Sequence, residues 1–279
     1  MPTVRLERAG LFGPVGVVDT ADARRFTIRG VLQGASLLDP SASIVDPSLP
    51  AGPGPVIETR YQLAWFLAAQ RHRTGRGLML GLGGGCGAVG ILHQFPGMQI
   101  DAVEADPAMT AMAREFHPLV SHYENVGRLR LHVADAVDYL DQAGSAFDFA
   151  IADLAVDGDS LGFLDSAPLI QAVAGAAPQV WFRVFGSLQD GEIRPFLEKF
   201  DQAGAPIDWL FSPVSVAVHF PRPRDWILAA GLTRPPGPDE FEPYGGVRGA
   251  KVAAVQEAYW KLVTRAVSAR DAVDLGRLA

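Results

Sequence analysis

Apolar and polar positions alternate in short pieces over the first 40 residues, at 3–6, 15–18 and 26–32. Successive residues of a strand point to opposite faces, so this alternation predicts a small antiparallel sheet. Proline then becomes frequent over residues 39–55, with Pro40, Pro47, Pro50, Pro53 and Pro55. Because proline fixes φ and lacks an N–H group, this segment is predicted to be a loop.

A different pattern begins at Glu58, where spaced apolar positions predict a helix. Beyond it, predicted strands at 78–82, 99–103, 129–133, 147–152 and 179–185 alternate with predicted helices at 87–94, 107–116, 136–142, 168–174 and 193–202. Parallel strands cannot be joined by tight turns, so this alternation predicts a mostly parallel α/β sheet. Two further strands, 209–219 and 226–229, have no helix between them and predict an antiparallel edge hairpin, which gives seven strands in total.

Length and composition predict three regions: a β-rich start with the proline-rich loop (1–55), a nucleoside-binding α/β domain (56–245) and a C-terminal segment (246–279) with an amphipathic helix at 250–267. No apolar run approaches the roughly 20 residues of a membrane span, and the start does not resemble a signal peptide. With a single cysteine, these features predict a cytoplasmic protein. The net charge of −7 argues against nucleic-acid binding.

Glycines cluster in the predicted turn between the first parallel strand and its helix, at Gly83, Gly84, Gly85 and Gly87. Such a turn lets backbone N–H groups approach a ligand closely. Gly85, Gly87 and Gly90 also satisfy the G-x-G-x-x-G of dinucleotide binders, so the glycines leave the nucleotide open. Cys86 lies in the same turn, either as a small residue in a crowded place or as a nucleophile at a helix start.

Acidic residues follow the next three predicted strands. Glu104 ends the second strand about 20 residues after the glycines, where a carboxylate can accept hydrogen bonds from ribose hydroxyls. Asp135, followed by Ala136, comes after the third strand, and Asp153 comes after the fourth. Open α/β sheets bind ligands at these strand ends, so the order predicts a nucleoside site. A further acidic cluster, Asp157, Asp159 and Asp165, could attract a cationic amine.

Other common sites are not indicated. The sequence has no P-loop motif and no G-x-S-x-G nucleophile elbow. Its six histidines include no helical H-x-x-x-H pair, so no metal site is expected. His117 and His122, on either side of Pro118, are predicted to be surface residues.

Residues 31–185 resemble the aminopropyltransferases, that is spermidine synthase and its relatives, within the class I methyltransferase fold. Four matches carry the resemblance: Leu80-Gly81-Leu82-Gly83-Gly84-Gly85, like the family's triple-glycine turn; Val103-Glu104-Ala105-Asp106-Pro107, like its V-E-x-D-P; Glu58 and Tyr61, like two positions of its D-E-F-x-Y-H; and Phe147-Asp148 to Asp153, like its Y-D-x-I-x-x-D.

The resemblance implies a Rossmann-like fold with S-adenosylmethionine or its decarboxylated form as co-substrate, no metal, a small-molecule amine acceptor and a homodimer. Glu104 would bind ribose, Asp135 adenine and Tyr61 the donor or acceptor chain. Asp153 would deprotonate the acceptor amine, with Asp157 as a second acid. The rest of the implied donor site comprises Gln33, Gly83, Gly84, Gly85, Cys86, Gly87, Ala105 and Ala136.

Three departures keep the reaction open. Cys86 replaces the family's acid after the glycines, Gln62 replaces its histidine after the tyrosine, and Asp157 is displaced by one position from its second acid. The first hypothesis is aminopropyl transfer to an amine. The second is methyl transfer or another reaction of intact S-adenosylmethionine, because its donor brings its own carboxylate and needs no acid at Cys86. The third is a non-catalytic nucleoside-binding protein.

Overall fold

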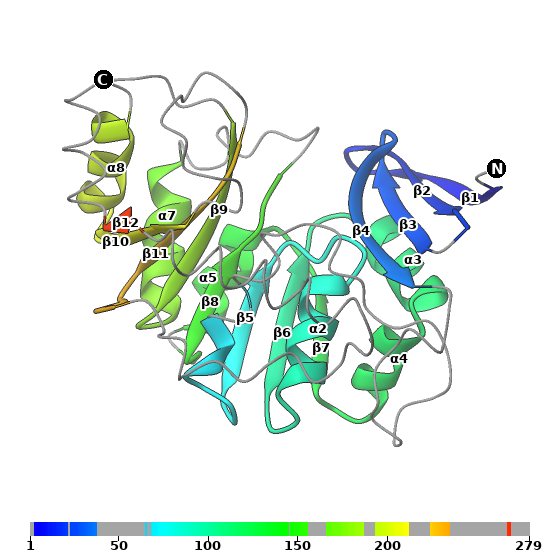
Figure 1. Ribbon diagram of the computed structural model, residues 1–279, viewed down its shortest axis with the longest axis horizontal. Coiled ribbons are helices and arrows are strands. Elements are labelled where there is room, and N and C mark those ends of the chain that lie inside the picture. Colours follow the sequence, from blue (N-terminus) through cyan, green and yellow to red (C-terminus); the bar gives the residue numbers. More distant parts are fainter. Residues whose placement is uncertain are drawn as a thin grey trace.

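The computed structural model describes residues 3–21, 23–37, 65, 68–144, 146–155, 166–186, 193–211, 224–234 and 267–268. They form two sheets with helices (Figure 1). Several sequence predictions lie outside these residues: the proline-rich loop beyond position 37, most of the predicted helix from Glu58 with Tyr61 and Gln62, the acids Asp157, Asp159 and Asp165, and nearly all of the predicted C-terminal helix.

The first sheet is the predicted antiparallel one, and it contains strands β1 (Thr3–Gly10), β2 (Gly13–Asp19), β3 (Ala23–Ile28) and β4 (Val31–Leu37) in that order. The single strand predicted over 26–32 is wrong, because a hairpin turn divides it. Arg29 has φ 49° and Gly30 has φ 78°. Two consecutive residues with positive φ form the turn type that best matches the twist of a two-residue hairpin.

The second sheet has eight described strands in the order β12-β10-β11-β9-β8-β5-β6-β7. Neighbours from β9 to β7 are parallel, and β11 runs antiparallel to both β9 and β10, as the predicted edge hairpin requires. The strands are β5 (Arg76–Leu80), β6 (Gln99–Glu104), β7 (Leu129–Val133), β8 (Phe149–Ala152), β9 (Val180–Gly186), β10 (Ile207–Phe211), β11 (Arg224–Ala230) and β12 (Val267–Ser268).

The strand β12 corrects the predicted end of the C-terminal helix. Val267 was placed in that helix, but it pairs with Leu210 at the outer edge of β10. Valine is β-branched and suits a strand, and the pairing covers an edge that would otherwise leave unpaired backbone groups. The described part of the sheet therefore has one strand more than predicted.

Helices cover both faces of the second sheet (Figure 1). Side chains of β5 point alternately to the two faces. Met79 packs in the apolar cluster on the face covered by α2 and α4, whereas Leu78 and Leu80 pack in the cluster on the face covered by α5, α7 and α8. The helices are α2 (Cys86–Gln94), α3 (Pro107–Phe116), α4 (Pro118–Asn125), α5 (Ala136–Ala143), α7 (Ala167–Ala176) and α8 (Ile193–Gln202). This is the three-layer arrangement expected for a parallel sheet. None of the helices in the described part of the chain is long and apolar enough to cross a membrane.

The N-terminal sheet packs on α3 through an apolar cluster that includes Phe26, Met109 and Met112. Two polar contacts support the packing: Arg8 pairs with Glu115 on α3 at 2.7 Å, and Arg24 donates a hydrogen bond to the carbonyl of Phe116. The first sheet is thus fixed to the helix that follows β6, close to the predicted nucleoside site.

His117 contradicts the sequence prediction of a surface residue, because its exposed fraction is 0%. It lies between α3 and α4, and its ring stacks on Phe26 with 6.2 Å between the ring centroids. Neither ring nitrogen has a hydrogen-bond partner within the described residues. Burial lowers the pKa of His117 to about 4, because the charged form would lose its hydration. The N-terminal sheet, which the local sequence around Pro118 cannot reveal, covers this histidine.

Candidate active site

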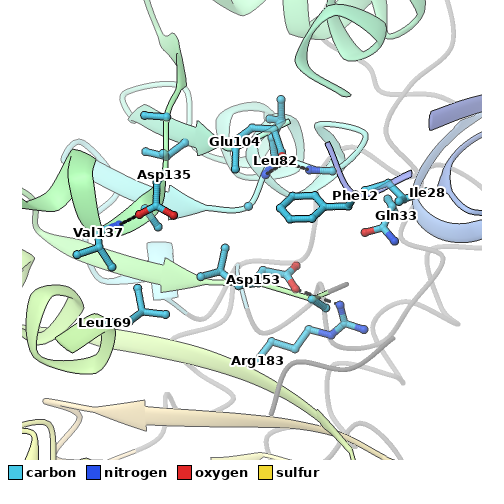
Figure 2. A pocket seen from close by; sticks show the side chains of 18 of the residues that line it. Phe12, Ile28, Gln33, Leu82, Glu104, Asp135, Val137, Asp153, Leu169 and Arg183 are labelled. Carbon is cyan, nitrogen blue, oxygen red and sulfur yellow. Dashed lines mark hydrogen bonds and ion pairs between the residues drawn. The ribbon is translucent and has the colours of Figure 1, made fainter. Parts of the chain in front are cut away.

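A cavity of about 310 Å³ lies at the carboxyl ends of β5, β6 and β8. Residues of the N-terminal sheet form another part of its wall, as Figure 2 shows for Phe12, Ile28 and Gln33. Both sheets therefore contribute to one cavity, at the edge where open α/β sheets bind their ligands.

The first half of the glycine turn lines this cavity, with Gly81, Leu82 and Gly83. Gly81 has φ 88°, and a side chain there would collide with the backbone carbonyl of Asp153. Gly83 has φ 52°, and a Cβ atom would lie 2.6 Å from the carbonyl oxygen of Gln33. Glycine at these two positions lets the turn, β4 and the end of β8 come together around the cavity.

The second half of the turn faces protein. Gly84, Gly85, Cys86 and Gly87, all predicted to bind the cofactor, are not among the residues that line the cavity. A Cβ atom on Gly84, Gly85 or Gly87 would lie 2.5 Å from Phe26, Val120 or Met79, respectively. The thiol of Cys86 is buried and donates a hydrogen bond to the carbonyl of Ala35 on β4. These residues hold the turn against the N-terminal sheet and the core, which supports the interpretation of Cys86 as a small packing residue.

Glu104 lies at the end of β6 and lines the cavity beside Leu82 (Figure 2). One carboxylate oxygen accepts hydrogen bonds from the N–H groups of Leu82, at 3.1 Å, and Gly83, and the other accepts one from Asp106. Burial raises the pKa of Glu104, although these three hydrogen bonds oppose the shift. Because each carboxylate oxygen can accept more than one hydrogen bond, Glu104 is oriented and still able to accept from a ligand hydroxyl.

Asp135 caps the N-terminus of α5 and lines the same cavity. Its Oδ1 atom accepts hydrogen bonds from the N–H groups of Val137, at 2.8 Å, and Asp138. The predicted donor-site residues Ala105, Ala136 and Gln33 also belong to the lining. The cap therefore holds the carboxylate at the cavity wall, in a position to accept a hydrogen bond from an adenine amino group.

Asp153 follows β8, lines the cavity and forms an ion pair with Arg183 of β9. Its Oδ1 atom lies 3.0 Å from Nη1 of Arg183, and only 14% and 16% of the two side chains are exposed. Arg183 was not among the site residues predicted from the sequence. A charged residue inside the apolar run 180–185 was the available signal, because charged side chains are rarely buried without a partner.

Phe12 is a second lining residue that was not predicted from the sequence. It lies in the turn between β1 and β2, and Figure 2 shows its ring among the side chains that line the cavity. The neighbouring N–H of Leu11 donates a 2.8 Å hydrogen bond to the buried carboxylate of Asp106, whose other oxygen caps α3. No local pattern around Phe12 predicts this position, because it depends on how the two sheets pack.

The charges of the described lining favour a cationic ligand. The lining contains three carboxylates, those of Glu104, Asp135 and Asp153, and one guanidinium, that of Arg183. A cavity with this excess of negative charge attracts cations such as a sulfonium or an amine. Within the described ranges, no three His, Cys, Asp or Glu side chains come together as metal ligands. Tyr61 and Asp157, predicted to act in catalysis, lie outside the described residues.

Several solved structures resemble the chain along most of its length. A probable spermidine synthase from Corynebacterium glutamicum superposes with a TM-score of 0.63 at 14% identity, covering 91% of this chain and 86% of that one. Spermidine synthase in complex with the transition state analogue AdoDATO gives 0.60 at 15% identity (86% and 77%). Spermidine synthase from Thermotoga maritima gives 0.57 at 15% identity (86% and 76%). These likenesses confirm the predicted fold, a Rossmann-like class I methyltransferase fold with an N-terminal sheet.

Sequence comparison adds a short match. A Mus musculus protein, eEF1A lysine and N-terminal methyltransferase, is 36% identical over 63 residues, which is 23% of this chain. The match spans only 8% of the length of that protein. No family model matches the chain.

Proposed function

We propose that this protein is an enzyme that transfers an alkyl group from a sulfonium nucleoside of the S-adenosylmethionine type to an amine. One observation carries the proposal: Glu104, Asp135 and Asp153, at the carboxyl ends of the parallel strands β6, β7 and β8, line a single cavity beside the glycine turn. In this proposal the adenine lies toward Asp135 and the ribose hydroxyls bind Glu104. The sulfonium then lies toward Phe12 and Asp153.

Such a transfer is an in-line displacement. The amine lone pair forms a bond to the carbon attached to sulfur, the carbon–sulfur bond breaks, and its electron pair stays on sulfur as a neutral thioether. The protein has to hold the two reactants about 3 to 3.5 Å apart and receive the proton that the amine loses. Asp153 is the proposed acceptor of that proton, and its ion pair with Arg183 fixes the orientation of the carboxylate.

The transferred group is aminopropyl or methyl. Aminopropyl transfer, to a small-molecule amine, is the first candidate, because the sequence motifs and the overall fold both resemble spermidine synthases. Cys86 supports methyl transfer, since an intact donor carries a carboxylate and needs no protein acid to hold its tail. In the structure the Cys86 thiol is buried against Ala35 on β4 and is not among the described residues that line the cavity.

Calorimetry with methylthioadenosine, S-adenosylmethionine, its decarboxylated form and NAD tests the proposal. Methylthioadenosine should bind, and E104Q should weaken its binding about 10-fold or more, because a hydrogen bond to a charged acceptor contributes roughly 1.5–3 kcal/mol. D138N, at an exposed position of α5 outside the lining, is the control and should bind like the unchanged protein. Binding of NAD in preference to methylthioadenosine and to both forms of S-adenosylmethionine would refute the proposal.

A second variant separates an enzyme from a binding protein. D153N should retain methylthioadenosine binding and lose most turnover, because an amide cannot accept the proton of the amine. Product formation from S-adenosylmethionine or its decarboxylated form, measured by mass spectrometry with a panel of amines, provides the assay. If the unchanged protein binds these donors but transfers nothing to any amine, the proposed transfer to an amine is refuted.

A further inference from the structure

Arg183 is the only cation among the described residues that line the cavity. Only 16% of the Arg183 side chain is exposed, so its guanidinium loses much of its hydration. The guanidinium pairs with Asp153 at 3.0 Å. A hydrophobic residue of similar volume would generally serve packing as well or better, so the charge calls for a functional explanation.

The position of Arg183 within the cavity suggests that function. Figure 2 shows Arg183 and Asp153 on the side of Phe12 and Gln33, away from the cap of α5 at Asp135 and Val137. With the adenosine between Asp135 and Glu104, as the proposed function requires, Arg183 faces the groups beyond the sulfur. These groups are the tail of the donor and the acceptor.

We propose that Arg183 binds a carboxylate on the substrate beyond the sulfonium centre, an inference that rests on the proposed function. A guanidinium presents five N–H donors on several edges, so it can hold a ligand carboxylate while it remains bonded to Asp153. The fork geometry of arginine matches a carboxylate in two parallel hydrogen bonds. Arg183 is therefore a specificity-determining residue for a carboxylate-bearing substrate.

The same charge opposes substrates without a carboxylate. A decarboxylated donor ends in an ammonium group, and a diamine acceptor brings two, so both would place like charges beside Arg183. Two sources of the carboxylate remain: the methionyl part of intact S-adenosylmethionine, or an amino-acid acceptor. The experiment distinguishes them.

The test measures dissociation constants for S-adenosylmethionine, its decarboxylated form and methylthioadenosine with the unchanged protein and with R183Q. If the donor supplies the carboxylate, the unchanged protein should bind S-adenosylmethionine at least 10-fold more tightly than the decarboxylated form. R183Q should remove that preference and change methylthioadenosine binding less than 2-fold. R183K should retain part of the preference, because it keeps the charge without the fork.

Two controls exclude indirect effects. R183Q leaves Asp153 unpaired, and its negative charge would itself repel a carboxylate. The double variant R183Q/D153N removes both charges of the pair and should still lack the preference for the intact donor. R114Q removes an arginine that pairs with Glu124 outside the cavity lining, and it should leave all three constants unchanged.

The acceptor arm compares ornithine with putrescine and lysine with cadaverine. If the acceptor supplies the carboxylate, R183Q should raise KM for the amino acid at least 10-fold relative to its diamine and leave donor binding unchanged. The inference is overturned if R183Q shifts neither preference while methylthioadenosine still binds. If methylthioadenosine does not bind the unchanged protein, the proposed function itself fails.

Discussion

The buried imidazole of His117 makes the stability of this protein depend on pH in a predictable way. Its pKa is about 4 in the folded protein, against 6.5 for an exposed histidine. As pH falls below 6.5, the unfolded chain binds a proton that the folded protein does not, so the free energy of unfolding decreases until pH reaches the folded pKa. At pH 4.5 the loss from this one residue should be roughly 2 to 3 kcal/mol relative to neutral pH.

The variant H117F isolates this contribution, because phenylalanine keeps an aromatic ring against Phe26 and has no group to protonate. Urea titrations at pH 7.5 and pH 4.5 give the free energy of unfolding at each pH. The decrease between the two pH values should be smaller in H117F than in the unchanged protein by roughly 2 to 3 kcal/mol. H122F, at a partly exposed position of α4, is the matched control and should leave the pH dependence unchanged. Equal pH dependence in the unchanged protein and H117F would refute the assignment.

Three further predictions concern the site and its supports. F12L should weaken the binding of S-adenosylmethionine several-fold more than the binding of S-adenosylhomocysteine, because an aromatic ring beside the positive sulfonium contributes roughly 0.5–2 kcal/mol. Calorimetry measures both dissociation constants, and equal losses would show that Phe12 only covers the cavity. G84A puts a Cβ atom 2.5 Å from Phe26 and should cost roughly 1–3 kcal/mol in urea unfolding, whereas an unchanged midpoint would mean that the sheet contact adapts freely. D101N removes the charge of a buried carboxylate that pairs with Arg76 at 2.7 Å and with His132 at 2.8 Å. Because 35% and 34% of these partner side chains are exposed, the expected cost is roughly 1.5–3 kcal/mol at pH 7 by the same assay; a loss below about 1 kcal/mol would contradict the role of this network.

The pH dependence that Asp101 contributes has the opposite origin from that of His117. Burial raises its pKa, but hydrogen bonds from Arg76 and His132 outweigh burial, so the pKa lies below the usual 3.8. The stabilisation by Asp101 is therefore present above the unfolded pKa and is lost as pH falls through the folded one. Since that window lies below pH 4, it does not overlap the loss due to His117 near pH 5.

The sequence predicted the parallel sheet well because each of its elements carries a local signal. The helix 107–116 starts with a proline after a capping aspartate, Asp106, and its predicted bounds match those of α3. Two elements were missed or misplaced where the boundary depends on backbone dihedral angles and not on the pattern of apolar residues. The turn at Arg29 and Gly30 was joined into one strand, and α4 was not predicted, because Pro118 starts a new helix directly after His117.

Prediction of the site succeeded for residues at strand ends and was incomplete for residues brought in by packing. Glu104, Asp135 and Asp153 line one cavity because the topology places the carboxyl ends of β6, β7 and β8 at one edge. Phe12 and Arg183 reach the same cavity from a distant hairpin and from the middle of a strand. Only the packing of the two sheets reveals Phe12, whereas Arg183 left a weak signal as a charge in an apolar run.

The contact between β4 and the glycine turn links donor binding to the folding of the first 37 residues. A sulfonium nucleoside in the cavity would touch Leu32 and Gln33 on one side and Gly83 on the other, so it can bind only when both sheets are together. By linkage, the ligand must then stabilise the docked arrangement of the two sheets, by a free energy that grows with the ligand concentration relative to its dissociation constant. Amide hydrogens of β1 to β4 should exchange more slowly when the donor is present, which makes the N-terminal sheet a reporter of occupancy at a site built largely from the rest of the chain.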